Sequence, residues 1–340
     1  MPELKGSLLA VTGGAGFIGS SLCALLVSRG ARVRVLDDLS TGSRAKLADA
    51  LAEAGHAPDA LELIAGDVRD PAALERTFAG ADAALHLACL GVRHSLHAPL
   101  ENHEVNARGT LLAVETARRL RVPRFVCVSS SEVYGTGETA QMAEDHPTRP
   151  HTVYGASKLA GEAYARAAWL TWGYPTVVIR PFNAYGPRAH HEGDSGEVIP
   201  RFLLRALAGR PLVVFGDGRQ TRDFTWVGDT ARGIVEVGLH PDAPGATVNL
   251  GAGAEVTIED LAGLVREAAG VPGVALEHQA PRPGDVRRLH ADARLARERF
   301  GFVPQVPLAE GLRRLAAWYR ARPESAAALL EGEVVRSWER

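Results

Sequence analysis

Short apolar runs alternate with longer stretches of mixed polarity over the first half of the chain. The runs are SLLAVTG, ARVRVLDD, LELIAGD, AALHLAC and RFVCVSS. Each has the length of a strand, and a nearly continuous apolar run is expected where both faces of a parallel sheet are covered. The alternation therefore predicts a parallel sheet with crossover helices on both of its faces.

The stretches between these runs are amphipathic, as expected of helices that cover a sheet. We predict helices over residues 17–29, about 100–119 and about 154–172, and a further strand in TVVIRPF. Gly30 directly follows the first of these helices and is suited to ending it, because glycine readily adopts the left-handed conformation common at helix ends.

From Asn183 onward the alternation gives way to segments rich in Gly, Pro, Arg and Asp, namely GPRAHHEGDSGEVIP, GDGRQTRDF and QAPRPGD. Such segments predict a smaller, loop-rich lobe. We expect it to cover the carboxyl ends of the strands, where open α/β sheets bind their ligands.

Composition narrows the class of protein. Apolar residues make up 46% and charged residues 23% of the 340 positions, as in a soluble globular protein. The 38 basic and 40 acidic residues form no long run of one sign, so we expect neither a nucleic-acid nor a membrane partner.

Cys23, Cys89 and Cys127 form no CxxC pair and are interpreted as packing residues in a reducing compartment. With no apolar stretch long enough for a membrane span or signal peptide, a cytoplasmic location is expected.

A glycine-rich turn, TGGAGFIG, lies between the first predicted strand and helix and contains Gly13, Gly16 and Gly19. Glycines at this spacing allow a tight turn and bring the backbone close to a pyrophosphate at the positive end of a helix. The second strand ends at Asp37, where a carboxylate can accept hydrogen bonds from both ribose hydroxyls and would repel a 2′-phosphate. The pattern predicts NAD rather than NADP as cofactor. Asp67, at the end of the third strand, is a candidate to bind the adenine ring.

These features predict an α/β fold, a Rossmann-type doubly wound parallel sheet with a smaller C-terminal α/β substrate-binding lobe. We assign residues 1–181, with about 226–252, to the NAD-binding domain. About 182–225 and 253–340 are assigned to the lobe.

Tyr154 and Lys158 stand four residues apart in YGASK, so a helix would place them on one face. A phenol is a poor base at neutral pH, but a neighbouring ammonium and a positive nicotinamide ring would lower its pKa. Tyr154 could then take a proton from a hydroxyl while hydride leaves the same carbon for NAD.

The motifs TGGAGFIG, LDDLSTG, GDVRD, HLA, SSSEVYG, YGASK, RPFNAYGP, GDGRQTRDF and PRPGD occur in this order over roughly residues 8–320. In this order they resemble the extended short-chain dehydrogenases/reductases that act on nucleotide-sugars. That family includes UDP-glucose 4-epimerase-like enzymes, sugar 4,6-dehydratases and UDP-glucuronate decarboxylases. The resemblance implies a nucleotide-sugar substrate and a homodimer formed through the helices at 100–119 and 154–172.

The resemblance also implies roles for individual residues. The catalytic residues would be Ser130, which binds the reacting hydroxyl, the base Tyr154, its modulator Lys158, and Glu132. The cofactor would contact Gly13, Gly16, Phe17, Ile18, Gly19, Asp37, Asp38, Asp67, Val68, Leu87, Ala88, Asn106, Tyr154 and Lys158. The substrate would contact Arg93, Ser130, Ser131, Asn183, Val198, Phe215, Arg222, Arg282 and Asp285. Arginines in such loops suit a pyrophosphate.

Glu132 bears on which reaction follows oxidation at C4. In the dehydratases a glutamate at this position removes the C5 proton, whereas an epimerase needs no second base. Ser131 stands where dTDP-sugar dehydratases usually have aspartate, and the decarboxylases usually have YDEGK where this chain has YGASK. LDDLSTG and GEVIPRF resemble the epimerases. We favour a UDP-hexose or UDP-hexuronate 4-epimerase, with dehydratase, decarboxylase and non-catalytic NAD-binding sensor as alternatives. The HHEGD cluster at 190–194 lacks helical spacing, and we expect no metal site.

Overall fold

The computed structural model describes residues 4–193 and 195–336. A seven-stranded sheet has the order β10-β6-β5-β4-β1-β2-β3, and all of its neighbouring strands are parallel. The strands are β1 (Leu8–Thr12), β2 (Arg32–Asp37), β3 (Glu62–Ala65), β4 (Ala83–His86), β5 (Phe125–Val128), β6 (Thr176–Pro181) and β10 (Thr247–Leu250). Strand order reverses beside β1, and an open sheet binds its ligands at such a switch point.

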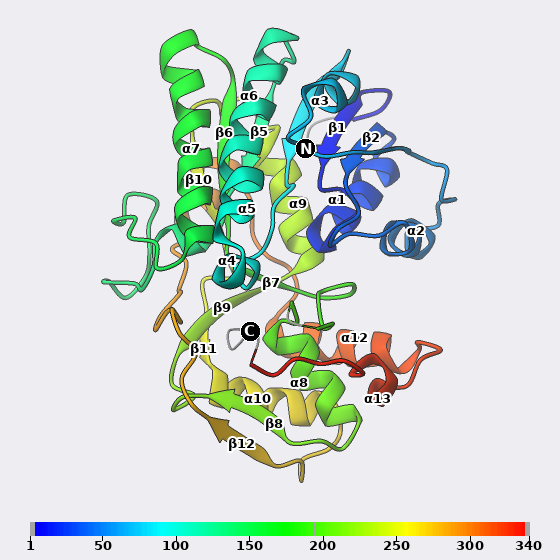
Figure 1. The fold of residues 1–340 in the computed structure, drawn as a ribbon, viewed down its shortest axis with the longest axis vertical. Coiled ribbons are helices and arrows are strands. Elements are labelled where there is room, and N and C mark those ends of the chain that lie inside the picture. Colours follow the sequence, from blue (N-terminus) through cyan, green and yellow to red (C-terminus); the bar gives the residue numbers. More distant parts are fainter. Residues whose placement is uncertain (1–3, 194, 337–340) are drawn as a thin grey trace.

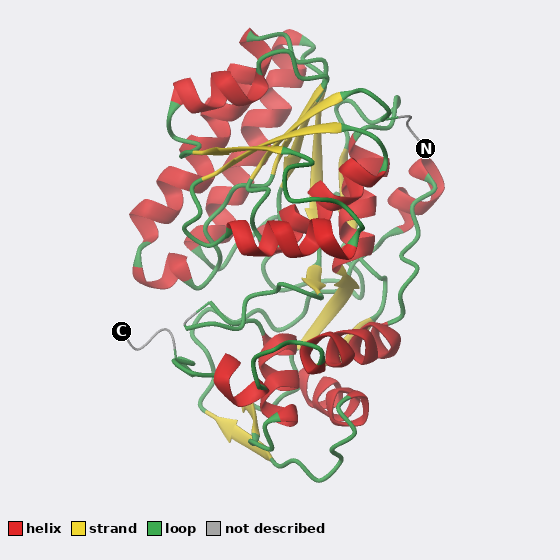
Figure 2. Cartoon of the chain, turned by 90° about the vertical axis from the view of Figure 1, so that its right-hand side faces the viewer, coloured by secondary structure: helices red, strands yellow, loops and turns green. Residues whose placement is uncertain are grey.

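Helices cover both faces of this sheet (Figures 1 and 2). One face packs against α1 (Phe17–Ser28), α2 (Arg44–Glu53), α9 (Val227–Gly238) and α11 (Arg294–Phe300). The other packs against α3 (Pro71–Phe78), α6 (Gly109–Arg119) and α7 (Val153–Trp172). Because side chains alternate along a strand, Leu9 and Val11 enter the first core while Leu8 and Ala10 enter the second. The predicted doubly wound sheet is confirmed.

The helix predicted over about 100–119 is interrupted. It consists of α5 (Pro99–His103), a π-helical turn η1 (Glu104–Arg108) and α6, preceded by the short α4 (His94–His97). A π turn inserts one residue into a helix and is frequent at functional sites. Here it lies at the buried Asn106, whose side chain bonds both the N–H and the carbonyl of Leu90.

The smaller lobe lies below the carboxyl ends of the strands in Figure 1. Its helices are α8 (Val198–Leu207), α10 (Ile258–Ala268), α12 (Leu308–Arg320) and α13 (Ala326–Leu329). Its strands form a sheet of β11 (Glu255–Thr257), β9 (Thr221–Trp226) and β7 (Asn183–Tyr185), and a parallel pair of β8 (Leu212–Phe215) and β12 (Leu276–Gln279). A third core, which includes Phe202, Leu261 and Leu315, joins its helices. The predicted α/β lobe is thereby confirmed.

The domain limits stay a prediction. Within 253–340, Phe300 and Phe302 belong to the first core of the large sheet, so this part of the chain packs on both halves of the molecule. In the part of the chain that the structure describes, no helix is both long and apolar enough to cross a membrane.

Candidate active site

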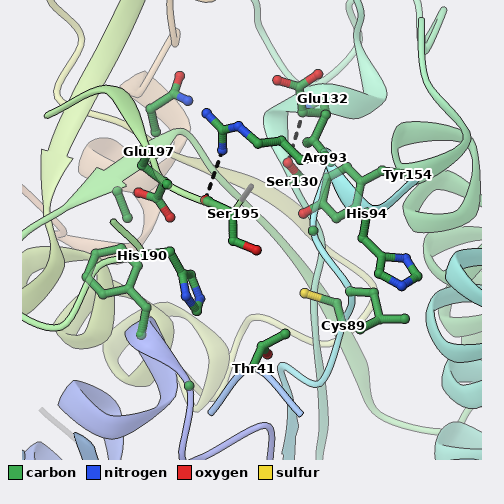
Figure 3. A pocket seen from close by; sticks show the side chains of 18 of the residues that line it. Thr41, Cys89, Arg93, His94, Ser130, Glu132, Tyr154, His190, Ser195 and Glu197 are labelled. Carbon is green, nitrogen blue, oxygen red and sulfur yellow. Dashed lines mark hydrogen bonds between the residues drawn. The ribbon is translucent and has the colours of Figure 1, made fainter. Parts of the chain in front are cut away.

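A cavity of about 520 Å³ extends from the glycine turn, past the ends of β4, β5 and β6, to the lobe. Residues from both halves of the molecule line it, and Figure 3 looks into it. All predicted site residues line this cavity except Asp67, which lies outside it, and Asn106, which lies behind it.

The glycine turn leaves no room for side chains. Gly13 has φ of 72°, and a Cβ there would lie 2.6 Å from the backbone nitrogen of Ala88. A Cβ at Gly19 would lie 2.0 Å from the carbonyl oxygen of Gly13. Within the described residues no side chain caps α1 at Gly16, so its first N–H groups are available at the cavity wall, which Phe17 and Ile18 also line. A pyrophosphate fits such a helix end.

Asp37 holds the next loop. Its carboxylate accepts hydrogen bonds from the N–H groups of Ala15 and Leu39, both at 2.9 Å, and burial raises its pKa. A carboxylate offers about four acceptor sites, so two remain for ribose hydroxyls. Asp38 also lines the cavity and accepts from the N–H and hydroxyl of Ser40.

Asp67, the candidate adenine contact after the third strand, does not line the cavity. Asp67 forms a two-pronged ion pair with Arg69, and hydrogen bonding to this guanidinium lowers its pKa. Its neighbours Gly66 and Val68 line the cavity instead, together with Leu87 and Ala88 of the β4 end. An adenine contact from the Asp67 carboxylate would require this ion pair to open.

Tyr154 and Lys158 lie in the first two turns of α7, which Thr152 caps by accepting a hydrogen bond from the N–H of Gly155 at 3.2 Å. Tyr154 faces the cavity beside Ser130 (Figure 3). Lys158 is 4% exposed, and its Nζ donates to the carbonyl of Val128 at 2.6 Å.

The chain's own groups raise the pKa of the Tyr154 phenol rather than lower it. Burial is the main cause and the nearby Cys89 adds to it, while a hydrogen bond with Ser130 acts in the opposite direction. The expected lowering depended on Lys158 together with a positive nicotinamide ring. Burial and the nearby Cys89 together outweigh the lowering effect of the hydrogen bond with Ser130 on this pKa.

The end of β5 is anchored from behind. Ser129 donates to the fully buried Glu162 at 2.6 Å, and Glu162 accepts two hydrogen bonds from Arg180 at 2.9 and 2.7 Å. Arg180 also donates to the hydroxyl of Tyr134, which donates to Asn249 at 2.7 Å. This network fixes the strand end that carries Ser130.

Glu132 lies in a single 3₁₀ turn, η2 (Ser131–Val133), whose N-cap Ser130 accepts from the Glu132 N–H at 3.2 Å. Burial raises its pKa, against the lowering influence of Arg222. In Figure 3 its carboxylate points away from the Ser130 hydroxyl. Ser131 is buried at the cavity edge.

The predicted substrate residues converge on the lobe side of the cavity, which Val198 also lines. Arg222 donates to Asp285 at 2.6 Å and to the Val286 carbonyl at 2.7 Å. The guanidinium of Arg282 lies over the Phe215 ring, 5.1 Å from its centroid.

Two further predicted residues lie nearer the strand ends. Arg93 donates to the carbonyl of Ser195 at 3.1 Å, and burial lowers its pKa to about 9. The buried Oδ1 of Asn183 has no partner within the described residues, which fits an atom that meets a bound group.

Other lining residues were not predicted. Burial raises the pKa of Glu197 to about 7 and lowers that of His190 to about 4. Both lie in segments singled out in the sequence, but no motif spacing there predicted a role in the site.

Cys23 and Cys127 pack in cores as expected, whereas Cys89 lines the cavity. Among the described residues, no group of His, Cys, Asp and Glu could hold a metal ion, and Asp194 of the HHEGD cluster lies outside them.

Residues 9–251 match the model of the NAD dependent epimerase/dehydratase family. This chain belongs to that family. It is 36% identical over 318 residues to a UDP-glucose 4-epimerase of Mycolicibacterium smegmatis, covering 92% of this chain and 99% of the relative. It is 35% identical over 321 residues to a dTDP-glucose 4,6-dehydratase of an Actinoplanes species, covering 92% and 98%.

The solved structure of the dTDP-glucose 4,6-dehydratase DesIV from Streptomyces venezuelae, with NAD bound, is 34% identical with a TM-score of 0.85. The matched region covers 92% of this chain and 97% of the DesIV chain. As a member of the NAD-dependent epimerase/dehydratase family, the chain uses NAD as cofactor, and the glycine turn and Asp37 fit that group. The family contains both isomerases and lyases.

Proposed function

We propose that the chain is an NAD-dependent nucleotide-sugar 4-epimerase that acts on a UDP-hexose or UDP-hexuronate through a transient 4-keto sugar. The main support for this proposal is that one cavity is lined by Ser130, Tyr154 and Lys158 together with the glycine turn and the arginines of the lobe. A sugar at this point would meet Ser130 and the base Tyr154 on one side, next to the glycine turn that would hold NAD. It meets diphosphate ligands on the other.

Each group has one task in the reaction. NAD supplies the hydride acceptor. Ser130 binds the 4-hydroxyl, and Tyr154 removes its proton and later returns it. The ammonium of Lys158 stabilises the Tyr154 phenolate. Asn183, Arg222 and Arg282 bind the diphosphate, which anchors the keto sugar while it turns over within the cavity.

Epimerisation is favoured over dehydration at the β5 end. A dehydratase must remove a proton from C5 and assist a leaving hydroxyl, but Ser131 carries no carboxylate for the second task. Glu132 supports the alternative, a 4,6-dehydratase, because burial raises its pKa at the cavity wall as a general base requires. The orientation of its carboxylate away from Ser130 favours the epimerase.

Purified protein should be incubated with UDP-, dTDP-, GDP- and CDP-sugars and the products read by mass and NMR. We expect a UDP-sugar to change configuration at C4 with no change in mass. Loss of water would identify a dehydratase, and loss of carbon dioxide a decarboxylase. NAD binding without conversion of any sugar would identify a sensor.

We also propose a cytoplasmic homodimer formed through α5, α6 and α7. These neighbouring helices expose the large apolar side chains of Leu100 (82%), Leu170 (80%) and Trp172 (57%), which the matching helices of a second copy would cover. Leu170→Glu should shift the protein to monomers in sedimentation equilibrium, while Val303→Glu, at an exposed site away from these helices, should not. A wild-type monomer, or a Leu170→Glu dimer, would contradict the proposed interface.

A further inference from the structure

The C-terminal segment, Gly332–Arg336, reaches the end of the cavity that lies in the lobe, opposite the glycine turn. Glu333 and Val335 line the cavity with residues of α8 and β8. The segment follows α13, which packs on α8, and Leu330, which is buried in the third core. Its position is therefore set by the folded lobe.

Ion pairs and backbone bonds hold the segment in place. The Glu333 carboxylate receives two hydrogen bonds from Arg205, at 3.0 and 2.9 Å, and these side chains are only 8% and 12% exposed. Arg201 donates to the carbonyl of Val334 at 3.0 Å, and the Val334 N–H donates to Gly193 at 2.9 Å. The segment is thus joined both to α8 and to the loop that accepts a hydrogen bond from Arg93.

The order of residues along the cavity indicates which part of a nucleotide-sugar would lie at this lobe end. The reacting sugar carbon belongs at Ser130 and Tyr154, and the diphosphate at Arg222 and Arg282. Along α8, Arg205 lies seven residues beyond Val198, roughly 10 Å at 1.5 Å per residue. The nucleoside of the substrate would extend toward this end, where Val213, Phe215, Arg205, Glu333 and Val335 line the wall.

We propose that Val335 and the Glu333–Arg205 ion pair form a wall of the nucleoside site and select the base of the nucleoside diphosphate. The inference rests on the proposed nucleotide-sugar substrate. A carboxylate beside a guanidinium presents an acceptor next to donors, which complements a pyrimidine edge with an N–H beside a carbonyl oxygen. Uracil has that edge, whereas cytosine has a bare ring nitrogen beside an amino group.

The test uses the NAD-loaded full chain, a chain that ends at Gly332, and the point variant Glu333→Ala. Affinities for UDP and CDP are measured by calorimetry, and KM and kcat with the UDP-sugar that the protein converts. For the chain that ends at Gly332 we expect the UDP Kd and the KM to rise about tenfold or more, the scale of losing an interface anchor. The preference for UDP over CDP should shrink in both variants, while kcat and NAD content stay near wild type.

Glu331→Gln is the matched control, because Glu331 is exposed just before the segment and should leave all values unchanged. Unchanged KM and base preference in both variants would overturn the inference, as would a lower KM, which would mean that the segment occludes the site. Glu333→Ala decides the matter if the shortened chain does not fold. Failure of the wild type to convert any nucleotide-sugar would contradict the proposed function instead.

Discussion

At the cofactor end of the cavity, the glycine turn and the strand-end carboxylate Asp37 lie close together in the sequence. Gly13 to Gly19 follow β1 and enter α1, and Asp37 is the last residue of β2. At the substrate end the lining comes from side chains that are far apart in the chain, from Arg93 to Val335. The cofactor end has a geometry that admits almost no side-chain change, while the substrate end depends on paired charges that can be exchanged.

Between the two ends, Tyr154→Phe should have the largest effect. The variant keeps its ring but has no proton to exchange, so turnover should fall at least about 100-fold. NAD binding, measured by fluorescence titration, should persist. Tyr164→Phe on the same helix is the control and should behave like wild type. Near-normal turnover of Tyr154→Phe would exclude the phenol as the base.

Gly13→Ala tests the cofactor end. A side chain here would collide with the Ala88 backbone. In addition, the alanine would have to adopt φ of 72°, a left-handed conformation that residues with a Cβ disfavour. We expect NAD affinity to fall about tenfold or more. Gly55→Ala has a similar φ of 80° but open space around its Cβ, so it should cost only about 1 kcal/mol of stability. Equal effects of the two variants on NAD binding would contradict close approach as the reason for Gly13.

Glu197 tests the substrate end through pH. Burial raises its pKa from 4.5 to about 7, so the folded state binds its proton more tightly than the unfolded chain. Its contribution to the free energy of unfolding should therefore fall as pH rises from 4.5 to 7 and level off above. Urea unfolding of Glu197→Gln across this range should show a weaker decline than wild type. An identical pH profile would mean that Glu197 is not held in its protonated form.

Glu132→Gln should have the smallest effect. An epimerase needs no second base, so turnover of the UDP-sugar should change by less than about threefold, below the usual loss for an acid–base group. A severe loss, measured as kcat with stable NAD binding, would favour the dehydratase instead.

The sequence was sufficient for the fold and the family because their signals are local. Apolar runs, the glycine turn and YGASK each lie within a few residues. The ion pair of Asp67 with Arg69 and the π turn at Asn106 were missed, because neither changes the apolar pattern. Glu333 was missed because its partner Arg205 lies 128 residues earlier, so that only the folded lobe brings them together.

The Ser129–Glu162–Arg180 network has a consequence for how such an enzyme can change. Ser129 directly follows β5, Glu162 lies in α7 and Arg180 lies in β6, so all three belong to the large sheet and the helices that cover it, and none comes from the lobe. The reaction centre is therefore anchored independently of the loops that contact the nucleotide-sugar. Lobe segments could be transplanted from relatives with other substrates while the proton-transfer geometry stays intact, which makes the fold modular for both evolution and engineering.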